Sequence, residues 1–234
     1  MGNFKNRIKN NSVFVWGMRA IFRLFGYNKI RGGRKNQIKI DGIMRKAKIN
    51  ILGKSNSIII KTPKSNVNLT IFIYGNNNKI IIEENCIING LTCWIEDDNN
   101  EIHIGKDTLI CRPIKLMCLE GQSIIIGERC MFAEGVNFRT SDSHSILNSS
   151  NQRINAPANI VLANHVWVGY QVLVLKGCSI AENTIIGAKS VVSKSCDQAG
   201  VVLAGTPAKI VKTNVNWDYQ RIPMGEKLDR QIDE

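Results

Sequence analysis

Residues 162–192 read LANHVWVGYQVLVLKGCSIAENTIIGAKSVV, and an aliphatic residue recurs at every sixth position of this stretch. The residues at that spacing are Leu162, Val168, Val174, Ile180, Ile186 and Val192. Six residues make one face of a three-sided coil, in which each face turns one aliphatic side chain inward. The stretch therefore predicts a triangular solenoid of parallel strands.

A longer spacing occurs earlier in the chain. The runs NSIII, NKIII, NEIHI and QSIII end at Ile60, Ile82, Ile104 and Ile126, a constant step of 22 residues. We interpret this step as an 18-residue coil with four extra turn residues, because stretches such as GNNNK and EDDNN are rich in Asn and Gly, which tolerate left-handed backbone conformations. The two spacings together predict coils from about residue 36 to residue 205.

Small residues follow the aliphatic ones at a fixed distance of four positions. They are Cys86, Thr108, Cys130, Cys178, Thr184, Ser190 and Cys196. A small side chain fits where the chain turns a corner, so four of the seven cysteines are explained as buried structural residues. The cysteines include no C-x-x-C pair and no disulfide-framework spacing, which favours a reducing compartment and predicts a cytoplasmic protein.

The positive charge is concentrated at the N-terminus. Residues 1–64 hold 16 Lys and Arg but one acidic residue, Asp41, and the net charge of the chain is +12. Within this segment, residues 12–25 space their apolar side chains as an amphipathic helix does, over a length too short to span a bilayer. Capping of the solenoid end, contact with anionic lipid headgroups, contact with an acidic glycan and an ordinary solvated basic surface all fit such a segment.

Units of the form aliphatic, Gly or Ala, two residues, small residue recur as IGKDTL, IGERCM, VGYQVL, IAENTI and IGAKSV. In these units the chain resembles the hexapeptide-repeat acyltransferases, which implies an all-β fold, a left-handed parallel β-helix, with a short N-terminal helix and a C-terminal extension. The motifs RTSDSHSI, ANHVWVG and AGTPAKIVK are similar to those of the maltose, galactoside and sialic acid O-acetyltransferases. The resemblance implies a homotrimer that transfers acetyl from acetyl-CoA to a hydroxyl of a sugar or surface polysaccharide.

We divide the chain into a basic N-terminal segment, 1–35, a solenoid acyltransferase domain, 36–205, and a C-terminal extension, 206–234. The aliphatic spacing fails after Phe138 and resumes at Leu162. The polar residues in between predict a surface loop near 139–158, where a loop commonly carries function.

His144 lies in this loop. Transfer of acetyl to a hydroxyl needs a base of near-neutral pKa, for which an imidazole is suited, and the resemblance assigns that role to His144. Asp142, two residues earlier, either orients the imidazole ring or caps its own turn.

The resemblance implies further site residues. Trp167 would line the acceptor or pantetheine channel, or pack at a subunit contact, or both. Gly169 would allow close backbone approach, and the amide of Tyr170 would donate to the thioester oxyanion. Related enzymes often have serine at this last position, so only the backbone donor is carried over. Room for pantetheine and cations for phosphates would come from Ala188, Lys189, Ala204, Gly205, Thr206, Pro207, Lys209 and Lys212.

Other chemistries fit less well. His103 and His165 are expected to point outward, His165 near a subunit contact, and the histidine gaps of 41 and 21 residues differ from the zinc ligands of γ-class carbonic anhydrases, so no metal is expected. Nucleotide triphosphate and NAD are not expected without a Walker or Rossmann glycine pattern, and the motifs do not suit nucleic acid. An N-acetyltransferase of an amino sugar nucleotide and a non-catalytic solenoid binding module remain as alternatives.

Overall fold

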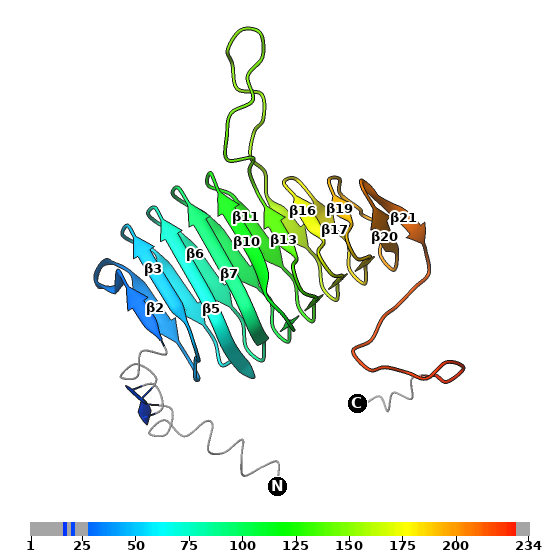
Figure 1. The fold of residues 1–234 in the computed structure, drawn as a ribbon, viewed down its shortest axis with the longest axis horizontal. Helices are drawn as coiled ribbons and strands as arrows, with labels where there is room; N and C mark the ends of the chain where they lie inside the picture. Colours follow the sequence, from blue (N-terminus) through cyan, green and yellow to red (C-terminus); the bar gives the residue numbers. More distant parts are fainter. Residues whose placement is uncertain (1–15, 18–19, 22–27, 228–234) are drawn as a thin grey trace.

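The computed structural model describes residues 16–17, 20–21 and 28–227, in which the chain winds into a three-sided solenoid of parallel strands (Figure 1). The expected helix at 12–25 lies mostly outside the described residues; 16–17 and 20–21 have helical backbone. The solenoid proper begins after the short 3-10 turn η1 (Gly33–Lys35). No helix in the described part of the chain has the length and hydrophobicity needed to cross a lipid bilayer.

The strands form two sheets, which make up three faces of a prism. The third face is a seven-stranded sheet of β2 (Gln37–Ile40), β4 (Ser57–Ile60), β6 (Lys79–Ile82), β8 (Glu101–Ile104), β11 (Ser123–Ile126), β14 (Ile160–Leu162) and β17 (Ser179–Ile180). The first and second faces share a 14-stranded sheet, because two long strands run across both faces, β5 (Ser65–Tyr74) and β7 (Ile87–Glu96).

The remaining strands belong to one face each. The first face continues through β9 (Leu109–Ile110), β12 (Met131–Phe132), β15 (Trp167–Val168), β18 (Ile185–Ile186) and β20 (Val202–Gly205). The second face contains β1 (Lys29–Arg31), β3 (Lys48–Leu52), β10 (Ile114–Leu119), β13 (Asn137–Arg139), β16 (Leu173–Leu175) and β19 (Val191–Val192). At the C-terminal end β21 (Ala208–Lys212) pairs antiparallel with β20 and closes the sheet.

The strand register confirms both predicted spacings. On the third face, Ser57 pairs with Lys79 in the early coils, whereas Leu162 pairs with Ile180 in the late coils. The four extra residues of the early coils are not confined to the turns, as the sequence suggested. They also lengthen the second face, where β10 has six residues and β16 has three.

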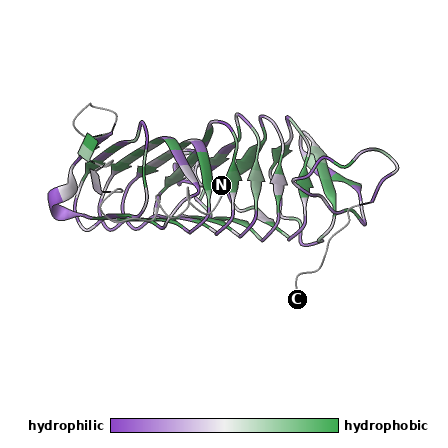
Figure 2. Cartoon of the chain, turned by 90° about the horizontal axis from the view of Figure 1, so that it is seen from below, coloured by the Kyte–Doolittle hydropathy of each residue, from purple (hydrophilic) through white to green (hydrophobic). Residues whose placement is uncertain are grey.

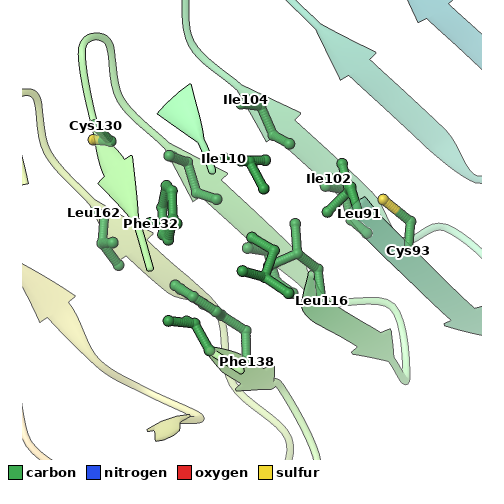
Figure 3. Packing of buried hydrophobic residues seen from close by; sticks show 14 of the residues in the cluster. Leu91, Cys93, Ile102, Ile104, Ile110, Leu116, Cys130, Phe132, Phe138 and Leu162 are labelled. Atoms are coloured by element: carbon green, nitrogen blue, oxygen red, sulfur yellow. The ribbon is translucent and has the colours of Figure 1, made fainter. Parts of the chain in front are cut away.

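The predicted inward residues form one continuous core. Their side chains from successive coils point into the interior, and the rings of Phe132 and Phe138 lie 6.0 Å apart (Figure 3). Burial of one aliphatic side chain stabilises the fold by about 1.5–3 kcal/mol, so repetition over the coils supplies the main driving force. Figure 2 shows mostly hydrophobic strands in green, whereas hydrophilic residues in purple are frequent at the corners.

The predicted corner residues are also buried, and each of the seven is at most 8% exposed. Burial raises the pKa of the Cys86 thiol to about 11 and that of Cys130 to about 12. A thiol with such a pKa stays protonated at neutral pH and is a poor nucleophile. The structural interpretation of these cysteines therefore holds.

A ladder of buried asparagines, which the sequence analysis did not anticipate, follows the corner between the second and third faces. Asn56, Asn78 and Asn100 are each 1% exposed. The Oδ1 atom of Asn56 accepts the amide N–H of Asn78 at 2.8 Å, and the Oδ1 atom of Asn78 accepts that of Asn100 at 2.8 Å. The Nδ2 atom of Asn78 donates to the carbonyl of Asp97 at 2.9 Å. Each side chain thus ties one coil to the next.

We predict that Asn78→Ala lowers the free energy of unfolding by about 1–3 kcal/mol, because it leaves the buried Asn100 N–H and the Asp97 carbonyl without this partner. Urea denaturation measures the change. Asn89→Ala is the matched control, since Asn89 is exposed and we expect a change within about 0.5 kcal/mol. Equal effects of the two substitutions would show that the ladder contributes nothing special.

Candidate active site

The loop predicted near 139–158 is an arm that projects away from the solenoid between β13 and β14 (Figure 1). We use the name arm for residues 140–158. At its base the amide of Ala158 donates to the carbonyl of Thr140 at 3.0 Å, so the two ends of the arm leave the solenoid side by side. Farther out, Leu147 and Arg153 form an antiparallel bridge, and the Ile154 amide donates to the Ile146 carbonyl at 2.9 Å. The arm is therefore an ordered hairpin.

A polar network fixes the arm to the solenoid. Arg153 makes a bidentate ion pair with Glu120, with nitrogen to oxygen distances of 2.6 and 2.9 Å, and the Ser141 hydroxyl donates to the same carboxylate. Asp142 pairs with Lys176 of the next coil. Two parallel hydrogen bonds give an Arg–carboxylate pair a defined geometry, so these contacts set the direction of the arm.

Asn155 joins the two sides of the arm and is 8% exposed. Its Nδ2 atom donates to Asp142 at 2.8 Å and to the His144 carbonyl at 2.7 Å. Its Oδ1 atom accepts the amide of Ile146 at 2.8 Å. The backbone on both sides of His144 is thereby held by one amide side chain.

The same contacts bear on Asp142. Its carboxylate binds Lys176 and Asn155, and no hydrogen bond joins it to the His144 ring within residues 28–227. Lys176 and then Asn155 hold the pKa of Asp142 below its ordinary value. Of the two alternatives drawn from the sequence, this geometry favours a carboxylate that shapes the turn; His144 itself is exposed.

The arm also carries apolar residues, although the loop was predicted from its polar residues alone. Ile146, Leu147 and Ile154 are 54%, 51% and 61% exposed. Three aliphatic side chains in contact with water at the tip of an ordered hairpin are unfavourable unless another surface covers them.

A second group of predicted residues gathers at the corner between the first and second faces, which we call the small-residue corner. Gly169 and Tyr170 follow β15, and Ala188 and Lys189 follow β18. Ala204 and Gly205 are the last two residues of β20, and Thr206 and Pro207 follow them. The register of β21 places Lys209 opposite Ala204 and Lys212 opposite Val202. The structure thus brings the sequence-predicted coenzyme residues to the C-terminal end of the solenoid, and all except Lys212 lie at this corner or next to it.

The small-residue corner combines a close approach of two coils with amides and lysines that could contact a ligand. A Cβ atom at Gly169 would lie 2.6 Å from the Ile186 carbonyl oxygen, so glycine is required here by the next coil of the same chain. The amides of Tyr170 and Ala188 donate to no acceptor among the described residues. Lys189, Lys209 and Lys212 have no ion-pair partner in that part of the chain either.

Trp167 lies on the first face, on β15, and is 37% exposed. The C-terminal extension returns to this face, where Trp217 packs with its ring centroid 6.0 Å from that of Trp167. The same indole stacks on His165 at 4.2 Å. His165 was expected to face outward near a subunit contact; Trp217 of its own chain stacks on it, and the subunit contact stays a prediction.

The predicted residues thus fall into two groups. Trp167 and the small-residue corner lie together, whereas the His144 arm leaves the solenoid from a different corner and points away from it. Among the described residues, no group of three His, Cys, Asp or Glu side chains is placed to hold a metal ion. His103 lies 3.4 Å from Glu83 on the third face, away from both groups.

Sequence reasoning missed several residues that shape the site. Asn155, Glu120, Arg153 and Lys176 position the arm, and Trp217 contacts Trp167. Asn155, Glu120, Arg153 and Trp217 do not belong to the six-residue spacing, and their partners lie as many as 52 residues away in the chain. Lys176 lies in the turn after β16, which the spacing predicts, but the spacing does not predict its partner.

Comparison with known proteins gives consistent findings. No profile of a known protein family matches the chain. It is 35% identical over 96 residues to a polysialic acid O-acetyltransferase of Escherichia coli O1:K1 / APEC, an alignment that covers 41% of this chain and 31% of that protein. It is 34% identical over 99 residues to a polysialic acid O-acetyltransferase of Neisseria meningitidis, covering 42% of this chain and 46% of that one. The matched region thus spans less than half of each of these curated relatives.

The structural comparison extends over more of the chain. The crystal structure of the polysialic acid O-acetyltransferase OatWY superimposes with a TM-score of 0.71 and 30% sequence identity. The superposition covers 86% of this chain and 91% of that chain.

We predict that acidification loosens the arm before it unfolds the solenoid. Arg153 lowers the pKa of Glu120, and Lys176 that of Asp142, so both carboxylates stabilise the arm above their ordinary pKa of about 4 and lose that effect as pH falls through the lowered values. Hydrogen exchange should show constant protection factors for the Ile146 and Ile154 amides between about pH 6 and pH 5, and falling values below about pH 4. In Glu120→Gln they should already be lower at pH 6. Protection that is independent of pH in the native chain would contradict the assignment.

Proposed function

Because the chain belongs to the hexapeptide-repeat acetyltransferases, we propose that it transfers the acetyl group of acetyl-CoA to a hydroxyl of a sugar or surface polysaccharide. The observation that carries this proposal is an exposed histidine on an ordered arm, in a solenoid whose small-residue corner gathers lysines and backbone amides that have no partner among the described residues. The names of the similar proteins make polysialic acid the first acceptor to test.

In this mechanism His144 is the general base. The acceptor hydroxyl attacks the thioester carbonyl carbon and gives its proton to the imidazole, which contributes about 10²–10⁴-fold to the rate. The new C–O bond forms, the C–S bond breaks, and the proton passes from the imidazole to the departing coenzyme thiolate. Asp142 acts on this step through Asn155 and Lys176, by holding the backbone of the arm.

The small-residue corner supplies the other contacts. The amide of Tyr170, which has no acceptor within residues 28–227, donates to the oxygen that becomes negative during attack, where a preorganised donor is worth about 10²–10³-fold. The short side chains of Ala188 and Ala204 leave the corner open for pantetheine, next to Gly205, Thr206 and Pro207. Lys189, Lys209 and Lys212 provide charge for the coenzyme phosphates.

The two groups of residues meet only if a second chain joins them. We place the His144 arm of one subunit against the Trp167 face and small-residue corner of its neighbour, in a homotrimer. The exposed Ile146, Leu147 and Ile154 support this arrangement, because a neighbouring subunit would remove their apolar surface from water.

The cellular setting follows from composition. Seven free cysteines suit the reducing cytoplasm. The basic N-terminal segment suits weak, salt-dependent contact with the anionic inner face of a membrane, and sedimentation with anionic vesicles at low and high salt tests that contact.

His144→Ala should lower kcat by about 10²-fold or more while the affinity for coenzyme A stays nearly unchanged, because the histidine acts on the acceptor proton. Thiol release from acetyl-CoA measures turnover with polysialic acid, a galactoside, maltose and an amino sugar nucleotide as acceptors. His103→Ala is the control and should retain full activity. Undiminished turnover in His144→Ala rules out the base, and acetylation of the amine alone would favour the N-acetyltransferase alternative.

Mixed subunits test the shared site. Ala188→Trp blocks the small-residue corner without touching the core, because Ala188 is exposed. After co-refolding equal amounts of His144→Ala and Ala188→Trp chains, about a quarter of the sites should combine two intact halves and recover that share of activity. If trimers form but activity does not exceed that of the separate variants, each subunit has its own complete site.

A further inference from the structure

The C-terminal strap, residues 213–221, follows the corner between the third and first faces and crosses three coils. Val215 accepts a hydrogen bond from Asn183 Nδ2 at 3.0 Å, and its amide donates to Gly200 at 3.0 Å. Two coils farther back, the Tyr219 hydroxyl donates to the Arg129 carbonyl at 2.8 Å. The strap is therefore anchored at both ends of its path.

Between these anchors lies Trp217, which is 5% exposed in a segment without regular secondary structure. Its indole N–H donates to the His165 carbonyl at 2.9 Å, which satisfies the polar atom of a buried ring. One side of the indole stacks on the His165 ring with an interplanar angle of 12°. Trp217 is thus fixed relative to β15, the strand that carries Trp167.

Three aromatic rings follow one another on this part of the first face. Trp217 is the middle ring, with its centroid 6.0 Å from Trp167 and 5.1 Å from Tyr219, which it meets edge to face. The outer two rings remain open to solvent, at 37% for Trp167 and 46% for Tyr219. The outward residues in line with Trp167 on the neighbouring strands, Met131 and Ile185, are apolar as well.

We propose that the C-terminal strap is a wall of the acceptor site, in which Trp217 positions the Trp167 indole and Tyr219 offers a second ring to a pyranose of the bound glycan. This inference rests on the proposed function for the identity of the ligand. A pyranose presents an apolar C–H face and a polar rim, which matches an exposed ring flanked by backbone polar groups. The small-residue corner borders the same face on its other side, so acceptor and coenzyme would approach Trp167 from opposite edges.

Four variants of the strap test whether it lines the acceptor site. Tyr219→Ala removes a ring, and Tyr219→Phe keeps it. Trp217→Ala frees the Trp167 side chain, and Trp217→Phe keeps a flat ring beside it. Met224→Ala, at a fully exposed residue beyond the strap, is the control. For each protein, steady-state kinetics give kcat and the KM of polysialic acid and of acetyl-CoA, titration calorimetry gives the Kd of polysialic acid without acetyl-CoA, and thermal melting reports stability.

Tyr219→Ala should raise the KM and Kd of polysialic acid about threefold to tenfold, as expected for the loss of one aromatic contact, and leave the KM of acetyl-CoA unchanged. Tyr219→Phe should stay within about twofold of the native chain. Trp217→Ala should raise the acceptor KM and lower kcat, and Trp217→Phe should recover part of both.

Other results would overturn the proposal that the strap lines the acceptor site. If Trp217→Ala and Tyr219→Ala lower only the melting temperature, the strap is a structural clamp. If they raise the KM of acetyl-CoA alone, the strap belongs to the coenzyme side. Failure of the proposed function can be told apart from failure of this proposal. A native chain that releases no thiol is not an acetyltransferase for the acceptors tested, but it can still bind polysialic acid. Equal Kd values for the native chain and Tyr219→Ala would then show that the strap does not line the acceptor site. The proposal is also refuted if the native chain binds none of polysialic acid, maltose and a galactoside.

Discussion

Hydrogen bonds between parallel strands hold each coil directly above the last, and the rest of the molecule depends on this stacking. At the corners the coils approach so closely that a Cβ atom at Gly105 would lie 2.5 Å from the backbone of Gly127. Residues cannot be added to such a wall without displacing the coils above. An insertion must therefore leave the wall, as the arm does between Phe138 and Ile160, or extend all neighbouring coils alike, as the early coils do.

The stacking also explains how polar residues are placed inside the prism. Because equivalent positions repeat directly above one another, Asn56, Asn78 and Asn100 each accept the amide of the residue one coil on. A buried amide is unfavourable alone but stabilising when every partner is present, so the ladder favours one register of the coils. The hydrophobic residues alone specify register less strictly, since most of them are isoleucine or valine.

The candidate site combines one corner of the rigid solenoid with two additions of different kinds. The small-residue corner is part of the solenoid itself, and its turns supply the amides of Tyr170 and Ala188, which donate to no acceptor in the described part of the chain. The arm is an insertion whose direction is set by Glu120, Arg153 and Asn155. The strap is a tail that returns over the finished coils and contacts Trp167 through Trp217. The surroundings of Trp167 thus depend on segments that the repeat does not contain.

By itself the sequence determined the solenoid, the inward and corner residues and the position of the arm. These features follow from spacing within one coil, where residues a few positions apart occupy neighbouring places. The role of His144 came from the family resemblance and stays a prediction. Only the tertiary structure decided that Asp142 binds Lys176 rather than the His144 ring, that asparagines form a ladder, and that Trp217 covers His165. Those contacts join residues 22 to 52 positions apart, through side chains whose partners are chosen by coil stacking and by the path of the tail. No local pattern encodes such a choice, because the same side chains would be equally compatible with an exposed turn.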